Sequence, residues 1–96
     1  MKRVAITGYG VVSPIGIGRK PFLDSLRSGH SGIGRISRFD CETFGVQLAA
    51  EVKGELSLPT RIEEVSSDDP KVGFAYAAAR EALAEAGIER ITDDTL

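Results

Sequence analysis

Cysteine, histidine and tryptophan are nearly absent from this sequence. Its 96 residues include one cysteine, Cys41, one histidine, His30, and no tryptophan. A single cysteine excludes an internal disulfide. One cysteine and one histidine cannot complete a four-ligand zinc site unless the fold adds several carboxylates. The sequence therefore predicts neither a disulfide nor a metal site.

Long hydrophobic runs are also missing. No apolar run approaches the roughly 20 residues that a membrane-spanning helix requires. After the basic Met1-Lys2-Arg3, the apolar Val4-Ala5-Ile6 stops at Thr7, which is too short for the about 7–15 apolar residues of a signal peptide. We therefore expect a cytoplasmic protein without membrane insertion.

The charges are unevenly distributed along the chain. Residues 1–54 carry eight Lys/Arg and four Asp/Glu, whereas residues 55–96 carry four and ten. This asymmetry is typical of two differently solvated faces. The basic half has too few charges and too few interleaved aromatic residues to indicate nucleic-acid binding. With 42% hydrophobic and 27% charged residues, the composition is that of one small globular domain.

Hydrophobic periodicity and the turn residues predict an α/β chain with the order β-α-loop-β-α. The expected elements are a buried strand at residues 3–7, a turn at 8–10, a helix from Pro21 to the cap Gly29, a long ordered loop over residues 30–44, a half-buried strand at 46–52, one helical turn at 61–65 and a helix from Pro70 to Ala86. In the loop, the expected anchors into a core are Ile33, Ile36, Phe39 and Phe44.

The last helix has the clearest signals. Asp69 can cap it, Pro70 suits its first position, and Gly87 can end it. Its expected apolar stripe is Val72, Tyr76, Ala79, Leu83 and Ala86. Seven alanines between Ala75 and Ala86 predict that another backbone approaches the helix closely. Glu81 and Glu85 form a like-charged i,i+4 pair from which no local stabilisation is expected.

A glycine-rich stretch after the first expected strand does not fit a nucleotide-binding loop. Such a loop has the pattern Gly-x-Gly-x-x-Gly between a strand and a helix. In Gly8-Tyr9-Gly10-Val11-Val12-Ser13 the third glycine is replaced by Ser13, and Pro14 follows where a helix should run. The second glycine pair, Gly16 and Gly18, follows no strand and has Pro21 at the third position. We therefore expect no nucleotide cofactor.

Other chemically capable residues also favour structural interpretations. Cys41 lies between Asp40 and Glu42, whose charges disfavour a thiolate. His30 lies among glycine and serine residues, as a solvated loop histidine does. The run of carboxylates Glu63, Glu64, Asp68 and Asp69 is typical of a solvated face. No catalytic, cofactor-binding or metal-binding residue is predicted.

Several stretches, in this order, resemble the start of the β-ketoacyl synthases of the thiolase-like superfamily, above all the elongating synthases of type II fatty-acid synthesis. They are Arg3 to Gly16, Gly29-His30-Ser31-Gly32-Ile33 continuing through Arg38-Phe39-Asp40, the strand ending Ala49-Ala50-Glu51-Val52-Lys53, and Ala77 to Leu83 followed by Ala86-Gly87-Ile88. The resemblance covers nearly the whole chain. It implies that residues 1–96 are the N-terminal part of a thiolase-like layered fold.

The resemblance also implies an activity. In this family a cysteine accepts an acyl chain from acyl carrier protein, two histidines assist decarboxylation of malonyl carrier protein, and the carbanion attacks the thioester near a backbone oxyanion hole. Those residues lie downstream in the family, so Cys41 and His30 match none of them and the segment alone is expected to be inactive. The parent enzyme would be a homodimer that binds acyl carrier protein and needs no cofactor.

Three alternatives remain open from the sequence: a ketosynthase subunit of a polyketide pathway, a non-catalytic synthase-like binding module, and, as the weakest, a nucleotide-binding domain. One departure bears on carrier-protein binding. Bacterial relatives often carry Lys/Arg just before the long helix, whereas residues 62–69 here are acidic and only Arg61 and Lys71 flank them. This composition predicts weaker attraction for an acidic carrier protein at that point.

Overall fold

The structure is a computed structural model that describes residues 1–56 and 69–89. Along the chain its elements are β1 (Val12–Ser13), β2 (Gly16–Ile17), α1 (Arg19–Ser28), β3 (Ile33–Arg35), β4 (Leu48–Ala50) and α2 (Pro70–Ala86). The strands form two separate antiparallel pairs, β1 with β2 and β3 with β4. The chain is thus mixed α/β, as the sequence predicts.

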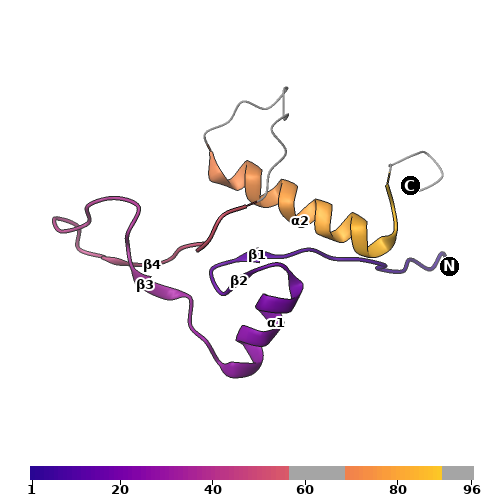
Figure 1. Cartoon of the computed structure of the whole chain (residues 1–96), viewed down its shortest axis with the longest axis horizontal. Helices are drawn as coiled ribbons and strands as arrows, with labels where there is room; N and C mark the ends of the chain where they lie inside the picture. The colour runs from indigo at the N-terminus through magenta and orange to yellow at the C-terminus, as the bar shows by residue number, and fades with distance from the viewer. Residues whose placement is uncertain (57–68, 90–96) are drawn as a thin grey trace.

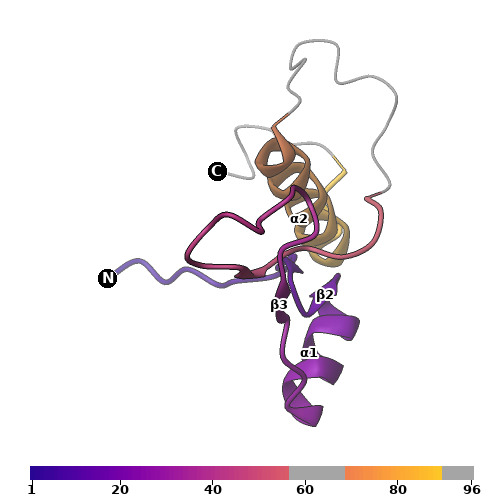
Figure 2. The ribbon, with the colours of Figure 1, turned by 90° about the vertical axis from the view of Figure 1, so that its left-hand side faces the viewer.

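The two helices lie on opposite sides of the β1–β2 hairpin (Figures 1 and 2). β1 contacts α2, and β2 contacts α1. Within the hairpin, the Ser13 hydroxyl donates to the Gly16 carbonyl at 3.0 Å and accepts the Ile15 N–H at 3.3 Å. The Ser25 hydroxyl of α1 donates to the Ile15 carbonyl at 2.6 Å, which ties the helix to the hairpin. A short hairpin therefore sits between a helix of 10 residues and one of 17.

The prediction for α2 is confirmed at both ends. Asp69 caps the helix by accepting the Lys71 N–H at 3.1 Å, and Pro70 is its first residue. Gly87 follows the last helical residue with a left-handed φ of 71°, at which a glycine avoids the strain of a Cβ. The N–H groups of Gly87 and Ile88 close the end of the helix on the Ala84 and Leu83 carbonyls.

Helix α1 begins two residues earlier than predicted. Its first residue is Arg19 rather than Pro21, and Gly18, at φ 95°, is the N-cap without a side-chain hydrogen bond. Proline is tolerated anywhere in the first turn because the N–H groups there have no partner within the helix. The predicted C-cap, Gly29, is confirmed at φ 71°.

The predicted strand at residues 3–7 is wrong for this chain. These residues form no strand, and the side chains of Val4 and Ile6 are 93% and 89% exposed. A strand requires a hydrogen-bonded neighbour, and the described residues offer none to this segment. The turn predicted at residues 8–10 is likewise absent, because these residues form neither a turn nor a bend.

The long loop after α1 contains a strand that the sequence interpretation missed. β3 pairs with β4 in the register Ile33 with Ala50 and Arg35 with Leu48. The predicted strand at residues 46–52 is confirmed at its centre, but its apolar face is exposed, with Val46 at 73% and Leu48 at 61%. The exposure does alternate along the strand, but Gln47, Ala49 and Glu51 are half-buried, so the face predicted to be buried is the exposed one.

The predicted anchors of the loop also lie largely in solvent. Ile33 is 65% exposed, and Phe39 and Phe44 are each 55% exposed. The two phenyl rings contact each other edge to face with centroids 5.5 Å apart. Only Ile36 is half-buried. The loop therefore packs its aromatic residues on each other and not into a core.

Cys41, at 2% exposure, is the one apolar side chain that is buried among the described residues. The stripe predicted on α2 is only partly covered, with Tyr76 37% exposed and Ala79 exposed. No helix in residues 1–56 and 69–89 is long and apolar enough to cross a membrane. The predicted turn at 61–65 and the carboxylates Glu63, Glu64 and Asp68 lie outside the described residues.

Candidate functional site

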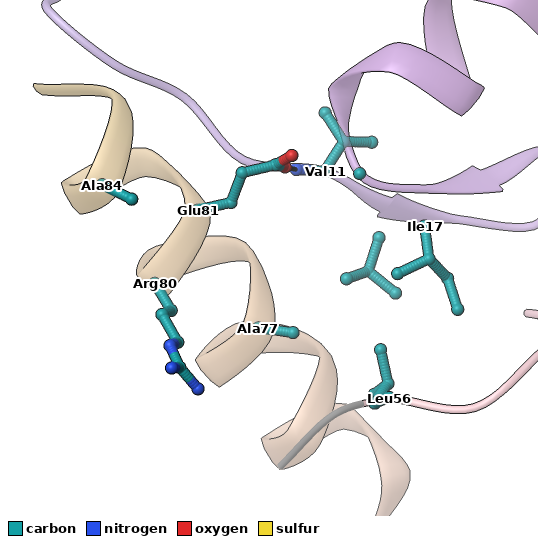
Figure 3. A pocket seen from close by; sticks show the side chains of 9 residues that line it. Val11, Ile17, Leu56, Ala77, Arg80, Glu81 and Ala84 are labelled. Carbon is teal, nitrogen blue, oxygen red and sulfur yellow. Dashed lines mark hydrogen bonds between the residues drawn. The ribbon is translucent and has the colours of Figure 1, made fainter. Parts of the chain in front are cut away.

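The carboxylate of Glu81 on α2 joins segments of the chain that are far apart in the sequence. Its Oε1 accepts the Val11 N–H at 2.9 Å, and its Oε2 accepts the Arg19 N–H, also at 2.9 Å. These partners are 70 and 62 residues away in the sequence. One side chain therefore joins three parts of the chain: α2, the segment before β1, and the start of α1. Figure 3 shows the Glu81 side chain pointing toward Val11.

This contact supplies α1 with the cap that its own sequence lacks. Gly18 has no side chain that could accept one of the free N–H groups at the helix start. The Glu81 carboxylate accepts the first of them, and its negative charge lies at the positive end of the helix dipole. The early start of α1 at Arg19 follows from this tertiary cap.

Glu85, one turn further along α2, makes a second set of contacts to the same segment. Its Oε2 accepts the Tyr9 N–H at 2.9 Å and forms an ion pair with the Arg19 guanidinium. Arg19 also donates to the Tyr9 carbonyl at 3.0 Å and lies over the Tyr9 ring, 5.5 Å from its centroid. We call Glu81, Glu85 and Arg19 the carboxylate clasp. The sequence predicted no local stabilisation from the Glu81–Glu85 pair. It could not show this role, because the residues that the two carboxylates contact are distant in the sequence.

The glycines of the N-terminal segment let its backbone touch α2 directly. A Cβ at Gly10 would overlap the Ala78 carbonyl oxygen and would lie 2.9 Å from the Ala78 Cα. A Cβ at Gly8 would overlap the Ala82 carbonyl oxygen and would lie 3.0 Å from the Ala86 nitrogen. The close backbone approach predicted from the alanines of α2 is therefore present, on the face that carries Ala78 and Ala82.

This geometry gives the glycine-rich stretch a structural purpose. The N–H groups of Tyr9 and Val11 are occupied by carboxylates, and α2 covers the glycines. A phosphate-binding loop instead offers free N–H groups at the start of a helix. The glycine-rich stretch therefore packs against α2 and is hydrogen-bonded to it. Its sequence also differs from the nucleotide-binding pattern, as described above.

A hollow of about 370 Å³ lies between α2 and the hairpin (Figure 3). Val12, Ile17 and Leu56 form apolar parts of its wall, and Arg80 and Glu81 are its charged residues. Glu81 is committed to the clasp, whereas Arg80 forms no ion pair within the described residues. Among the described residues that line it there is no cysteine, histidine or hydroxyl side chain.

The two residues with classical catalytic side chains are placed apart from this hollow. Cys41 is buried, and its Sγ lies 3.8 Å from the Ile36 carbonyl, as a weak donor would. His30 is exposed, and its backbone N–H donates to the Ser25 carbonyl at the end of α1. Among the described residues no three His, Cys, Asp or Glu side chains are placed to hold a metal ion. That the chain carries no catalytic residue stays a prediction.

Glu51, next to β4, holds the loop after β3. Its carboxylate accepts the Ser37 hydroxyl at 2.9 Å and the backbone N–H groups of Ser37 and Arg38 at 3.1 and 3.2 Å. These hydrogen bonds, led by that of the Ser37 hydroxyl, lower the pKa of Glu51 below its ordinary value of 4.5. The charged carboxylate thus attaches residues 37–38 to β4.

We expect this attachment to weaken in acid. The pKa of Glu51 is lower in the folded chain than its ordinary value of 4.5. The charged Glu51 carboxylate therefore contributes fully to stability above pH 4.5, and this contribution is lost as the pH falls through the lower, folded pKa. A titration of the Ser37 and Arg38 amide resonances should show a midpoint below 4.5. The Ser37→Ala variant lacks the hydroxyl hydrogen bond that lowers the pKa of Glu51 most, so the midpoint should rise in this variant. Equal midpoints in both proteins would contradict the assignment.

Comparison with known proteins identifies the family to which these elements belong. Residues 1–95 match the sequence profile described as "Beta-ketoacyl synthase, N-terminal domain". This chain belongs to the β-ketoacyl synthase family. Its mixed α/β structure is the beginning of the ketosynthase, thiolase-like fold, as the resemblance in the sequence implied.

Two curated relatives illustrate the range of this family. Oxytetracycline polyketide putative beta-ketoacyl synthase 1 of Streptomyces rimosus is 42% identical over 88 residues, which are 91% of this chain and 21% of the relative. The 3-oxoacyl-[acyl-carrier-protein] synthase 2 of Coxiella burnetii is 39% identical over 89 residues, 92% of this chain and 22% of the relative. The β-ketoacyl synthase segment thus spans about a fifth of the length of these relatives.

A solved structure agrees with the sequence matches. The ishigamide ketosynthase/chain length factor superposes with a TM-score of 0.70 at 36% identity, over 95% of this chain and 22% of that chain. In the β-ketoacyl synthase segment described here, the clasp, the glycine contacts and the hollow all lie where the N-terminal segment, the hairpin and α2 meet.

Proposed function

We propose that this chain is the N-terminal part, over residues 1–96, of a 3-oxoacyl-[acyl-carrier-protein] synthase that elongates acyl chains in fatty-acid biosynthesis. The supporting observation is the match of residues 1–95 to the N-terminal domain of β-ketoacyl synthases, with relatives about five times longer. Relatives from Coxiella burnetii and Staphylococcus aureus, at 39% and 38% identity, carry the 3-oxoacyl synthase name.

The proposed reaction is a decarboxylative Claisen condensation. A cysteine thiolate takes the acyl group from acyl carrier protein and releases the carrier thiol. Malonyl carrier protein loses CO₂, and the resulting carbanion attacks the acyl-enzyme thioester, so that the cysteine leaves as thiolate and a 3-oxoacyl carrier protein forms. The nucleophile and the histidines belong to the part of the enzyme that follows this segment. The complete enzyme acts with acyl carrier protein and is a homodimer.

Within that enzyme the segment supplies scaffold and no reacting group. The described residues that line the hollow beside the clasp include no cysteine, histidine or hydroxyl side chain, and Cys41 is buried and has two acidic neighbours in the sequence. The exposed apolar side chains of Val4, Ile6, Val46 and Leu48 are those expected of a unit whose covering layers come from elsewhere. The 96-residue chain by itself is therefore inactive.

A ketosynthase of a polyketide pathway is the second candidate. The Streptomyces rimosus polyketide relative is 42% identical, and the ishigamide ketosynthase/chain length factor shares the fold at 36% identity. These two relatives support a polyketide role as directly as the relatives from Coxiella burnetii and Staphylococcus aureus support fatty-acid synthesis. The two candidates share the condensation step.

The function is tested with a chimera and with the chain alone. In the chimera, residues 1–95 replace the matched segment of the Coxiella burnetii synthase. We expect the chimera to form an acyl-enzyme, seen as a mass increase, and to release CO₂ from malonyl carrier protein, and we expect the 96-residue chain to do neither. A folded chimera without acyl loading would instead support the non-catalytic binding module.

A further inference from the structure

Ser37 lies at the start of the exposed loop that follows β3. Figure 1 shows this loop, residues 36–47, projecting away from α1 and α2. Ser37 is itself exposed, and its hydroxyl donates to Glu51 Oε1 at 2.9 Å. In the part of the chain that the structure describes, this is the only hydrogen bond of the hydroxyl. A modifying enzyme can therefore reach the Ser37 hydroxyl from solvent.

Arginines flank Ser37 on both sides. Arg35 precedes it by two residues and Arg38 follows it directly, and both are exposed. Every other serine or threonine of the sequence lacks an arginine within two residues on at least one side. The positive charge of Arg38 lies close enough to Glu51 to contribute to the lowered pKa of that carboxylate. The surroundings of the Ser37 hydroxyl thus contain both a cation that can pair with a phosphate and an anion that repels one.

A phosphate on Ser37 would change the partners of this residue. It carries a charge of about −1.5 to −2 at neutral pH, so it is repelled by a neighbouring carboxylate and attracted by arginine. Esterification also removes the hydroxyl proton that Ser37 donates to Glu51. The backbone N–H groups of Ser37 and Arg38, which Glu51 accepts at 3.1 and 3.2 Å, would lose their acceptor when the carboxylate moves away.

We propose that Ser37 is a phosphorylation site and that a phosphate there releases residues 37–38 from Glu51 and pairs with Arg38. The phosphoryl donor is ATP, and the enzyme is a serine/threonine kinase that selects basic residues around the acceptor. The bond between the γ-phosphorus and the oxygen that stays with ADP breaks, a bond from phosphorus to Ser37 Oγ forms, and the hydroxyl proton passes to the carboxylate base of the kinase. The site does not depend on the proposed function, because no part of it requires the condensation reaction.

The acceptor is tested by incubating the 96-residue chain with ATP and the catalytic domain of a protein kinase C, which prefers basic residues on both sides of the acceptor. We expect the intact mass to increase by one phosphoryl group, and fragmentation to place that group on Ser37. Ser37→Ala should abolish the increase. Ser31→Ala is the matched control, since Ser31 is an exposed serine before β3 without flanking arginines, and it should leave the increase unchanged. Absence of transfer to Ser37 would overturn the site.

The role of the flanking charge is measured by the rate of transfer. Arg38→Ala should slow the transfer to Ser37 at least about tenfold, because a charged contact between the acceptor segment and the kinase is lost. Arg27→Ala removes an exposed arginine from α1 and should leave the rate unaltered. Equal rates for Arg38→Ala and Arg27→Ala would contradict selection by the flanking arginines.

The release is tested by amide exchange of the chain phosphorylated at Ser37. The amides of Ser37 and Arg38 should exchange at least about tenfold faster than in the unmodified chain, after correction with a short peptide that carries the same phosphate. Those of Tyr9 and Val11, which are held by α2, should keep their rates and show that the chain stays folded. In Glu51→Ala the attachment is already lost, so phosphorylation should add no acceleration. Unchanged exchange after phosphorylation, or an equal acceleration in Glu51→Ala, would refute the release.

Discussion

Replacing Gly10 by alanine is expected to detach the N-terminal segment from α2. The new Cβ would overlap the Ala78 carbonyl oxygen and lie 2.6 Å from the Ala78 carbonyl carbon and 2.9 Å from its Cα. All three atoms belong to the helix backbone, so no side-chain rotation relieves the overlap. We expect a cost of about 3 kcal/mol, at the upper end for overpacking, and roughly 100-fold faster amide exchange at Tyr9 and Val11.

Gly45→Ala is the matched control for this change. A Cβ at Gly45 has no heavy atom within 4 Å, and the residue has no positive φ. The control should therefore leave exchange at Tyr9 and Val11 unaltered. If Gly10→Ala and Gly45→Ala gave the same exchange rates, direct packing of the glycine backbone on α2 would be refuted.

Glu81→Ala should release two parts of the chain together. The N–H groups of Val11 and Arg19 lose the carboxylate that accepts both, and hydrogen bonds to charged groups contribute about 1.5–3 kcal/mol. We expect both amides to exchange roughly ten- to a hundredfold faster, and the first turn of α1 to lose its cap. Amide exchange read by NMR measures both sites in one experiment.

Two further variants separate the clasp from general effects of charge. Glu89→Ala removes a carboxylate that makes no hydrogen bond within the described residues, and it should change neither amide. Glu81→Gln keeps a single carbonyl oxygen, so it should retain at most one of the two contacts. If only Val11 responded to Glu81→Ala, the role of Glu81 as the cap of α1 would be wrong.

The clasp and the glycine contacts act on the same short segment from two directions. Gly8 and Gly10 bring its backbone onto α2, and the carboxylates of Glu81 and Glu85 accept the N–H groups of the residues between and after them. Steric fit sets the separation of segment and helix, and the alternating hydrogen bonds set the register. Together these contacts attach residues 8–11 to α2.

Local signals in the sequence determined the elements whose causes are local. α2 follows from Asp69, Pro70 and Gly87, which act within one helical turn of its ends, and the predicted bounds were correct. The C-cap Gly29 and the centre of β4 were also predicted correctly from local signals. Family membership was also readable from sequence, because the order of several short stretches is specific even where each alone is not.

Tertiary structure alone decided the elements and contacts whose partners are distant in sequence. The cap of α1 comes from Glu81, 62 residues away, so the sequence around Gly18 could not show that the helix begins at Arg19. Val4 and Ile6 have the pattern of a buried strand, yet burial depends on neighbours that these residues do not encode. The sequence by itself specified which faces are apolar. Which of them are covered is a property of the assembled fold, because hydrogen bonding and burial both require a second surface.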